Sequence, residues 1–264
     1  MGMKNLMIYV SPNKTFDNPT WGNESEILVK IQIDNSLEIG WKPEEIMLVA
    51  NFYYQYRGIE SVIVSDDNYY QDSASTPSKI NAIIELFERG LIDDDIYWFH
   101  DFDAFQLEPF DRDFDKNKIA LTNYGITNIS KGHNGRWSTG SIFFGNNTKD
   151  VFEWIKTAVY KYQKNEEVAL LALTRHNKHQ ILDRIEKLNI TYNFATRRRN
   201  VVEQYKITEL PIKVIHFHPY DKRPVFYLHT GKDNMAVCVR GENPMGKPLV
   251  TEGLIKIFKN HGIE

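Results

Sequence analysis

The chain has 264 residues, which is enough to bury one sizeable core, and its 42% hydrophobic and 25% charged residues are ordinary for a globular protein. A formal net charge of -3 gives no general electrostatic attraction to nucleic acid or an anionic membrane, so we expect neither as a partner. The single cysteine, Cys238, excludes an internal disulfide, and no apolar run approaches the ~18 residues that cross a bilayer. We therefore expect a cytoplasmic protein with no transmembrane segment.

The first hundred residues alternate between short apolar runs and amphipathic patterns. A helix is predicted over residues 24–39, and a second helix has Thr76 as its N-cap, Pro77 at its first position and Gly90 at its end. The predicted strands cover residues 6–10, 46–50 and 61–64 and the run that begins at Ile96. This alternation predicts an α/β fold with a mostly parallel, Rossmann-like sheet flanked by helices.

The second half continues the same mixture. A strand is predicted at residues 119–122, and a glycine-rich loop over 131–140 leads into another strand at 141–144. A late strand is predicted over residues 213–218, whereas residues 221–264 have weak periodicity and predict no element. The helices predicted between these strands cover residues 151–162, 166–175 and approximately 180–188.

The apolar run from Ile96 ends in two carboxylates, Asp101 and Asp103. Such a run is typical of a strand buried in a parallel sheet, and ligands bind beyond the carboxyl ends of these strands. Asp-x-Asp at this position can hold a hard divalent cation, which is a natural partner for a substrate diphosphate. Three further Asp-x-Asp matches begin at residues 93, 111 and 113, but charged, turn-like surroundings favour solvated loops there.

A histidine near the late strand is a candidate third ligand. His216 follows Ile215, and imidazole together with carboxylates suits Mn²⁺ better than carboxylates alone. His218 lies two residues further on and would share the same face of a strand. The chemistry of the residues alone leaves the choice between His216 and His218 open.

Several short motifs follow one another in a recognisable order. They are Ser78-Lys79-Ile80-Asn81, Asp101-Phe102-Asp103, Trp137-Ser138-Thr139-Gly140 before an apolar strand, Glu166-Glu167, Tyr192-Asn193, and the segment from His216 through Lys222 to Pro224. This order, over roughly residues 4 to 226, resembles that of GT-A fold nucleotide-sugar glycosyltransferases, particularly the family-8-like group. The chain departs from the family's His-x-x-Gly-x-x-Lys-Pro element by having Pro219 in place of glycine and Arg223 before Pro224.

The resemblance implies roles for these residues. The His-to-Lys spacing selects His216 over His218, so the implied ligands of Mn²⁺, or Mg²⁺, are Asp101, Asp103 and His216. The implied catalytic pair is Glu166 and Glu167, of which one would act as a base if the reaction inverts configuration; a retaining reaction needs no base in that place. The residues expected to bind the donor are Lys79, Phe102 and Lys222, together with Ser11 and Asp66, which follow early strands and could meet the base and ribose.

We therefore expect a single GT-A domain over residues 1–264. Its nucleotide-binding half would be 1–105, its acceptor and catalytic half 106–226, and its C-terminal extension 227–264. The resemblance implies a metal-dependent transferase that moves a sugar from a nucleoside-diphosphate sugar, most simply a UDP-sugar, to a glycan or other glycoconjugate hydroxyl. The alternatives are a sugar nucleotidyltransferase or an inactive protein that binds nucleotide sugars or carbohydrate.

Overall fold

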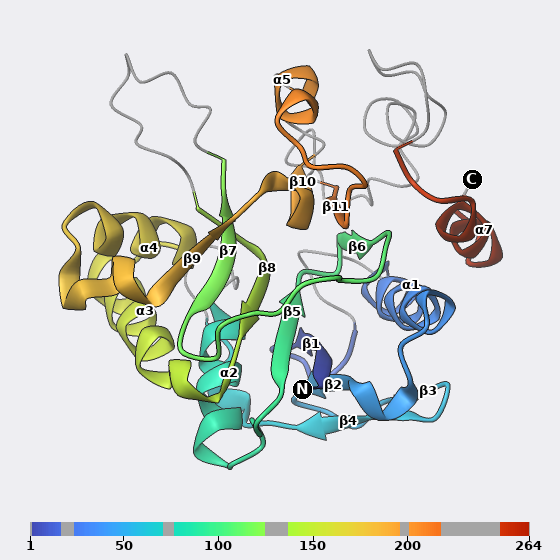
Figure 1. The fold of residues 1–264 in the computed structure, drawn as a ribbon. Helices are drawn as coiled ribbons and strands as arrows, with labels where there is room; N and C mark the ends of the chain where they lie inside the picture. Colours follow the sequence, from blue (N-terminus) through green and yellow to red (C-terminus); the bar gives the residue numbers. More distant parts are fainter. Residues whose placement is uncertain are drawn as a thin grey trace.

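A computed structural model gives the fold and describes residues 2–16, 24–70, 77–124, 137–195, 201–217 and 249–263. The described part contains a central eight-stranded sheet (Figure 1). Six of these strands run in one direction, and β3 and β8 run against them. In spatial order the strands are β3 (Gln55–Tyr56), β4 (Ile59–Ile63), β2 (Ile46–Ala50), β1 (Met3–Tyr9), β5 (Ile96–His100), β8 (Trp137–Phe144), β7 (Ile119–Asn123) and β9 (Ile185–Leu188).

Helices cover both faces of this sheet because its strands are apolar on both sides. On β5, Tyr97 and Phe99 join the core beneath α2, α3 and α4, whereas Ile96 and Trp98 join a separate cluster on the other face. On that other face α1 packs against β1 and β2, and α7 packs against α1. The described helices are α1 (Glu24–Ile39), α2 (Ser78–Glu88), α3 (Lys149–Tyr162), α4 (Glu166–Arg175), α5 (Val201–Lys206) and α7 (Glu252–Asn260).

A second, three-stranded sheet lies at the carboxyl end of β5 (Figure 1). Its strands are β10 (Phe194–Ala195), β11 (Val214–His216) and β6 (Ala104–Gln106). β11 runs antiparallel to β6, and their register places His216 opposite Ala104. This pairing brings the late histidine next to the turn that carries Asp101 and Asp103.

The α1 helix holds that turn through a buried amide. Gln32 is 1% exposed, and its Nε2 donates to the carbonyl oxygens of Phe102 and Ala104, each at 2.9 Å. These bonds satisfy backbone carbonyls at the end of β5 and the start of β6, which would otherwise be costly to bury. The position of the two acids is therefore fixed by a helix far away in the sequence.

The structure confirms the fold class and most of the predicted elements. The GT-A arrangement, with a mostly parallel sheet flanked by helices, is present, and the bounds of α1, β2 and α4 agree with the predicted ones. The helix expected near residues 180–188 is wrong: a kinked 3-10 segment over Lys178–Arg184 is followed by strand β9. Positive φ at Asn177, His179 and Gln180 prevents a regular helix there.

Smaller differences concern the ends of elements. The predicted loop over residues 131–140 is partly wrong, because Trp137–Gly140 already belong to β8, and residues 131–136 lie outside the described part. Pro77 precedes the first residue of α2, and Thr76 lies outside the described residues. The weak periodicity of residues 221–264 does not predict α7, whose N-cap is Thr251. None of the described helices combines the length and apolar character that a membrane crossing requires.

Candidate metal and donor site

The two acids lie in a tight turn at the carboxyl end of β5. The turn is closed by the Ala104 amide, which donates to the Asp101 carbonyl at 2.9 Å. The Asp101 amide donates to the Gly140 carbonyl of β8 at 3.0 Å, and the Phe217 amide donates to the Asp103 carbonyl at 2.9 Å. The backbone of both acids is thus tied to neighbouring strands.

Asp101, Asp103 and His216 each offer a ligand atom, and these atoms lie within 4.8 Å of one another. His216 is 3% exposed, and its Nε2 lies 3.1 Å from Asp103 Oδ1. Two carboxylates and one imidazole form a donor set that suits Mn²⁺ or another divalent cation. The residues predicted as metal ligands therefore come together in a geometry that fits the ion.

The pKa values in this group reflect burial among opposite charges. Burial raises the pKa of Asp101, although the Lys79 ammonium partly opposes this effect. Burial alone would lower the pKa of His216, but the adjacent Asp103 carboxylate outweighs it and the pKa is raised. The raised pKa of His216 reflects the neighbouring negative charge, whereas the raised pKa of Asp101 is mainly an effect of burial.

Asn193 fixes the orientation of the His216 ring. Its Nδ2 donates to Ser138 Oγ at 2.9 Å, so its Oδ1 accepts from His216 Nδ1, also at 2.9 Å. With Nδ1 committed in this way, Nε2 is directed toward Asp103 and can serve as the ligand nitrogen. The sequence offered Asn193 only as part of the Tyr192-Asn193 pair and did not indicate this role.

A buried ion-pair cluster adjoins the two acids. Lys79, at the start of α2, contacts Asp101 Oδ1 at 2.9 Å, Glu166 Oε1 at 3.1 Å and the Thr139 carbonyl at 3.2 Å. These acceptors use all three ammonium hydrogens. Thr139 Oγ1 also donates to Glu166 Oε1 at 2.8 Å, whereas the buried Oε2 of Glu166 has no hydrogen-bond partner in the described part of the chain.

Lys79 and Glu166 stabilise each other's charged forms. Burial would raise the pKa of Glu166, but the Lys79 charge and the hydrogen bonds to the carboxylate lower it. Burial would likewise lower the pKa of Lys79, but Asp101 and Glu166 raise it. Glu167 is partly exposed, so the structure places only Glu166 of the acidic pair in this buried cluster.

The other predicted donor residues fall at the same edge of the sheet. Asn51 accepts from the Ser11 amide at 2.9 Å and donates to the Ser11 carbonyl at 2.8 Å and to Asp66 Oδ1 at 2.9 Å. This cluster follows the ends of β1, β2 and β4, which run parallel to β5. Phe102 lies edge-on to Tyr9 with ring centroids 6.1 Å apart. Lys222 and the open alternative His218 lie outside the described residues.

Gly140 allows β8 to approach the ligands closely. A Cβ at this position would overlap Cε1 of His216 and would lie 2.7 Å from its Nδ1 and 3.1 Å from Asp101 Oδ2. Real Cβ atoms do not make contacts this short with a packed ring. The absence of a side chain at Gly140 is therefore a requirement of the site.

Comparison with solved structures supports the fold. The galactosyltransferase LgtC, solved with donor and acceptor sugar analogues, matches with a TM-score of 0.57 and 11% identity over 98% of this chain and 95% of that one. The bifunctional glycosyltransferase WbbM matches with a TM-score of 0.52 and 13% identity over 98% of this chain and 51% of that one. The glycosyltransferase GlyE of Streptococcus pneumoniae TIGR4 matches with a TM-score of 0.50 and 10% identity over 83% of this chain and 56% of that one.

These neighbours are GT-A glycosyltransferases, and the chain has their fold together with an Asp-x-Asp group at the end of the central strand. No protein-family model matches the sequence, and no curated protein matches it significantly. At identities of 10 to 13%, the likeness establishes the architecture. Activity has to be argued from the residues of the site.

Replacing Gly140 by alanine tests the close approach of β8. The new methyl group would displace the His216 ring and press on Asp101, so we expect Mn²⁺ affinity to fall about tenfold or more. Calorimetric titration with Mn²⁺ measures this loss. Gly253→Ala is the matched control, because the nearest atom to its Cβ is 3.7 Å away. Unchanged affinity in Gly140→Ala would mean that the ligands are not held in this arrangement.

Replacing Lys79 by methionine tests the buried ion pairs. The change leaves Asp101 and Glu166 without their shared cation, so we expect a loss of about 3–5 kcal/mol in the free energy of unfolding at neutral pH. Lys149→Met removes a partly exposed lysine whose Nζ lies 3.4 Å from Glu153 Oε1, and it should cost well under about 1 kcal/mol. Urea unfolding of both variants, and of Lys79→Met combined with Glu166→Gln, measures the effect; the second change should restore part of the loss.

The wild type and Lys79→Met should also differ in how their stability depends on pH. In the wild type the lowered pKa of Glu166 contributes stability above its unfolded value, and this contribution is lost as pH falls through the folded value. Without Lys79, burial raises that pKa, so the variant gains stability as pH falls. The difference between wild type and Lys79→Met should therefore narrow toward acid pH. A difference that stays constant down to about pH 4 would contradict the pairing.

Proposed function

We propose that this protein is a metal-dependent glycosyltransferase that moves a sugar from a nucleoside-diphosphate sugar, favouring a UDP-sugar, to a hydroxyl of a glycan or other glycoconjugate. The observation that carries the proposal is the grouping of Asp101, Asp103 and His216 within 4.8 Å at the end of the central strand of a GT-A sheet. Ligands of open α/β sheets bind at this edge.

Asp101, Asp103 and His216 would hold Mn²⁺ or Mg²⁺. When bound, the cation would neutralise the diphosphate and stabilise the charge that grows on it as the glycosidic bond breaks. The protein's contribution is to hold the three ligands in place before the donor arrives. Gln32 fixes the turn that carries the two acids, and Asn193 fixes the imidazole ring of His216. Gly140 leaves the space that the ligands need beside β8.

Lys79 supports the site by neutralising its carboxylates. Because all its hydrogens already have protein acceptors, we propose that it acts on the donor by fixing Asp101 rather than by contacting a phosphate directly. Lys222 lies six residues after His216, and because of this spacing it remains our proposed phosphate contact.

Glu166 is the acidic residue best placed to act on the reacting groups. Its Oε1 is held by Lys79 and Thr139, and its buried Oε2 has no partner among the described residues. A charged, oriented carboxylate oxygen of this kind can accept a hydrogen bond from a sugar hydroxyl, or the proton of an acceptor hydroxyl if the reaction inverts. Glu167 stays a prediction made from the sequence.

Recognition of the nucleoside is proposed for the ends of the first strands. Ser11, Asp66 and the linking Asn51 supply carbonyl, amide and carboxylate groups that can meet a base and ribose. Phe102, between the two metal-binding acids, offers an apolar surface next to Tyr9. These contacts are the part of the site from which preference for one nucleotide would arise.

Calorimetric titration of UDP and GDP, each with and without Mn²⁺, tests the proposal. We expect tight binding of one nucleotide, favouring UDP, that requires Mn²⁺ and falls at least about tenfold in Asp103→Ala. Asp183→Ala, which removes an exposed carboxylate outside the site, should bind as the wild type does. Slow Mn²⁺-dependent hydrolysis of the matching nucleotide sugar should be lost in Asp103→Ala only.

The alternatives give different results in the same series. Metal-dependent binding without hydrolysis or transfer would indicate a binding protein. Release of pyrophosphate from a nucleoside triphosphate and a sugar phosphate would indicate a nucleotidyltransferase. Failure of a well-folded protein to bind either nucleotide would contradict the site assignment itself.

A further inference from the structure

A cavity of about 480 Å³ opens at the amino ends of β1 and β5, opposite to the ends that lead to the metal ligands. The residues that line the cavity include Met3 and Ile96, the first residues of β1 and β5. The same two strands run parallel, and their other ends lead to the donor cluster and to the metal ligands. Met3 and Ile96 therefore lie a strand length away from the metal ligands, and the volume of the cavity lies within the range typical of ligand pockets.

Rigid aromatic rings form one part of the cavity wall. The Trp41 indole is nearly parallel to Trp98, with centroids 6.4 Å apart, and its Nε1 donates to Gln106 Oε1 at 2.6 Å. Phe110 is held edge-on to Trp98, with centroids 4.9 Å apart. Both rings remain partly accessible, so they present a fixed apolar surface to an occupant of the cavity.

Charged side chains form the rest of the wall. Glu45, Asp111 and Asp113 line the cavity together with one basic residue, Arg112, which pairs with Glu186 of β9. Asp111 is paired with Lys213 at 3.1 Å. Asp113 is exposed, and in the described part of the chain its carboxylate has no ion pair or side-chain hydrogen bond. The lining thus has more acidic than basic groups and one carboxylate that is available to a ligand.

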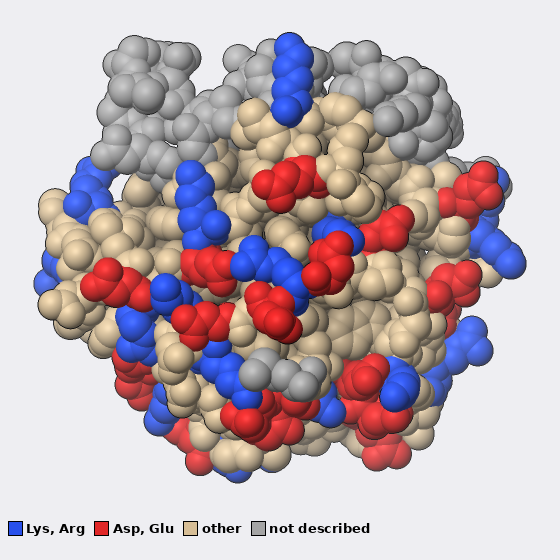
Figure 2. All heavy atoms as spheres, in the orientation of Figure 1, with Lys and Arg blue, Asp and Glu red and all other residues tan. Residues whose placement is uncertain are grey.

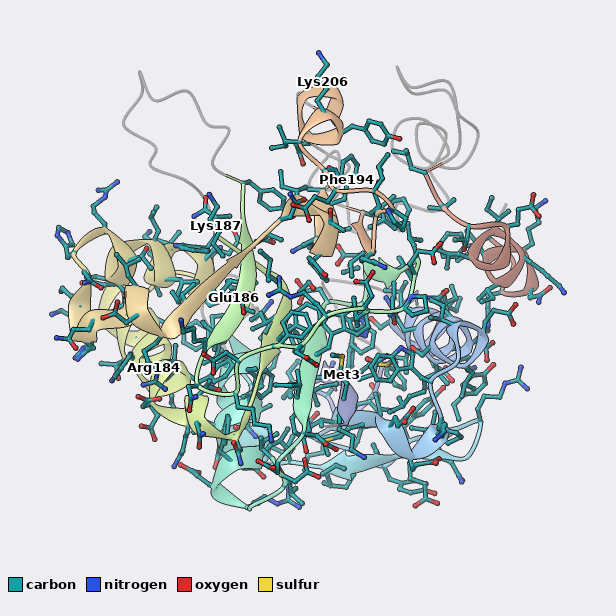
Figure 3. All side chains as sticks on the ribbon, viewed as in Figure 1. Met3, Arg184, Glu186, Lys187, Phe194 and Lys206 are labelled. Atoms are coloured by element: carbon teal, nitrogen blue, oxygen red, sulfur yellow. The ribbon has the colours of Figure 1, made fainter. Side chains whose placement is uncertain are left out.

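The face that contains the cavity can be followed in two views. Figure 3 labels Met3 near the middle of the molecule and Glu186 above and to the left of it, on β9. Figure 2 shows acidic and basic side chains gathered on this same face. The cavity opens to solvent beside the exposed residues Asp111 and Asp113, and among its lining residues Gln106, the last residue of β6, belongs to the three-stranded sheet.

The aromatic rings and carboxylates of the cavity wall indicate which class of ligand the cavity can bind. The Asp113 carboxylate, which has no ion pair among the described residues, disfavours a phosphate or another anionic ligand beside it. Sugar rings present apolar C–H faces, which pack on aromatic rings, and hydroxyls, which donate to carboxylates. A neutral saccharide meets both the aromatic and the acidic parts of the wall.

We propose that this cavity is a second saccharide-binding site, which holds neutral sugar residues of a glycan at a distance from the metal site. The proposal extends the proposed function, because a transferase that acts on glycans gains from a second contact with the glycan chain. Its binding chemistry does not involve the metal ligands, so the two proposals can fail separately.

Binding of the full-length protein to an array of neutral, sialylated and sulfated glycans, in EDTA and without nucleotide, tests the site. We expect neutral glycans to bind in preference to acidic ones, and Asp113→Arg to weaken that binding about tenfold. Asp183→Arg is the matched control, since it reverses an exposed aspartate elsewhere, and it should bind as the wild type does. Asp103→Ala should also bind glycans normally, although it loses metal-dependent nucleotide binding.

Three results would overturn the proposal: no glycan binding by folded wild-type protein, preference for acidic glycans, or binding that Asp113→Arg leaves unchanged. Thermal unfolding of each variant confirms that it is folded, and because Asp113 is exposed the substitution should not alter stability appreciably. Loss of nucleotide binding alone would count against the proposed function and not against this cavity.

Discussion

The arrangement of the candidate site depends on concentrated negative charge that the protein only partly neutralises. Asp101, Asp103 and Glu166 lie together, and Lys79 contacts two of them from within the protein. His216 adds positive charge only when it is protonated, and its raised pKa shows that the site attracts a proton. A divalent cation is the natural complement to this charge, because buried carboxylates without a partner are costly. The same excess of acid would work against folding if Lys79 were absent.

The strand topology brings the candidate metal ligands together from distant parts of the sequence. The antiparallel pairing of β11 with β6 brings His216 to the Asp-x-Asp turn, and α1 fixes that turn through Gln32. Because β8 runs against β5, its first residues lie beside the carboxyl end of β5, where Gly140 leaves room for the ligands. Interactions that are weak individually therefore add up to a prearranged set of donors, which is what differential stabilisation of a leaving group requires.

The parts of the structure that local pattern controls could be predicted from the sequence. The helix Lys149–Tyr162 has clear periodicity, the strand Ile96–His100 is an apolar run, and the order of the motifs indicated the fold. Strand β9 was mistaken for a helix because it has only four residues, two of them charged, and its identity comes from pairing with β7. The burial of Glu166 against Lys79 and the ring contact of Asn193 with His216 could not be predicted, since both arise from tertiary packing. The same is true of the cavity beside Met3 and Ile96, whose walls come from four separated segments.

Anomalous diffraction from crystals grown with Mn²⁺ and UDP would locate the metal ion directly. We expect one strong manganese peak with Asp101, Asp103 and His216 as ligands and the UDP diphosphate completing the coordination. In this complex, Asn193 should keep its hydrogen bond with His216 Nδ1. A manganese peak elsewhere, or UDP bound at the strand ends with no metal on these three residues, would contradict the central claim.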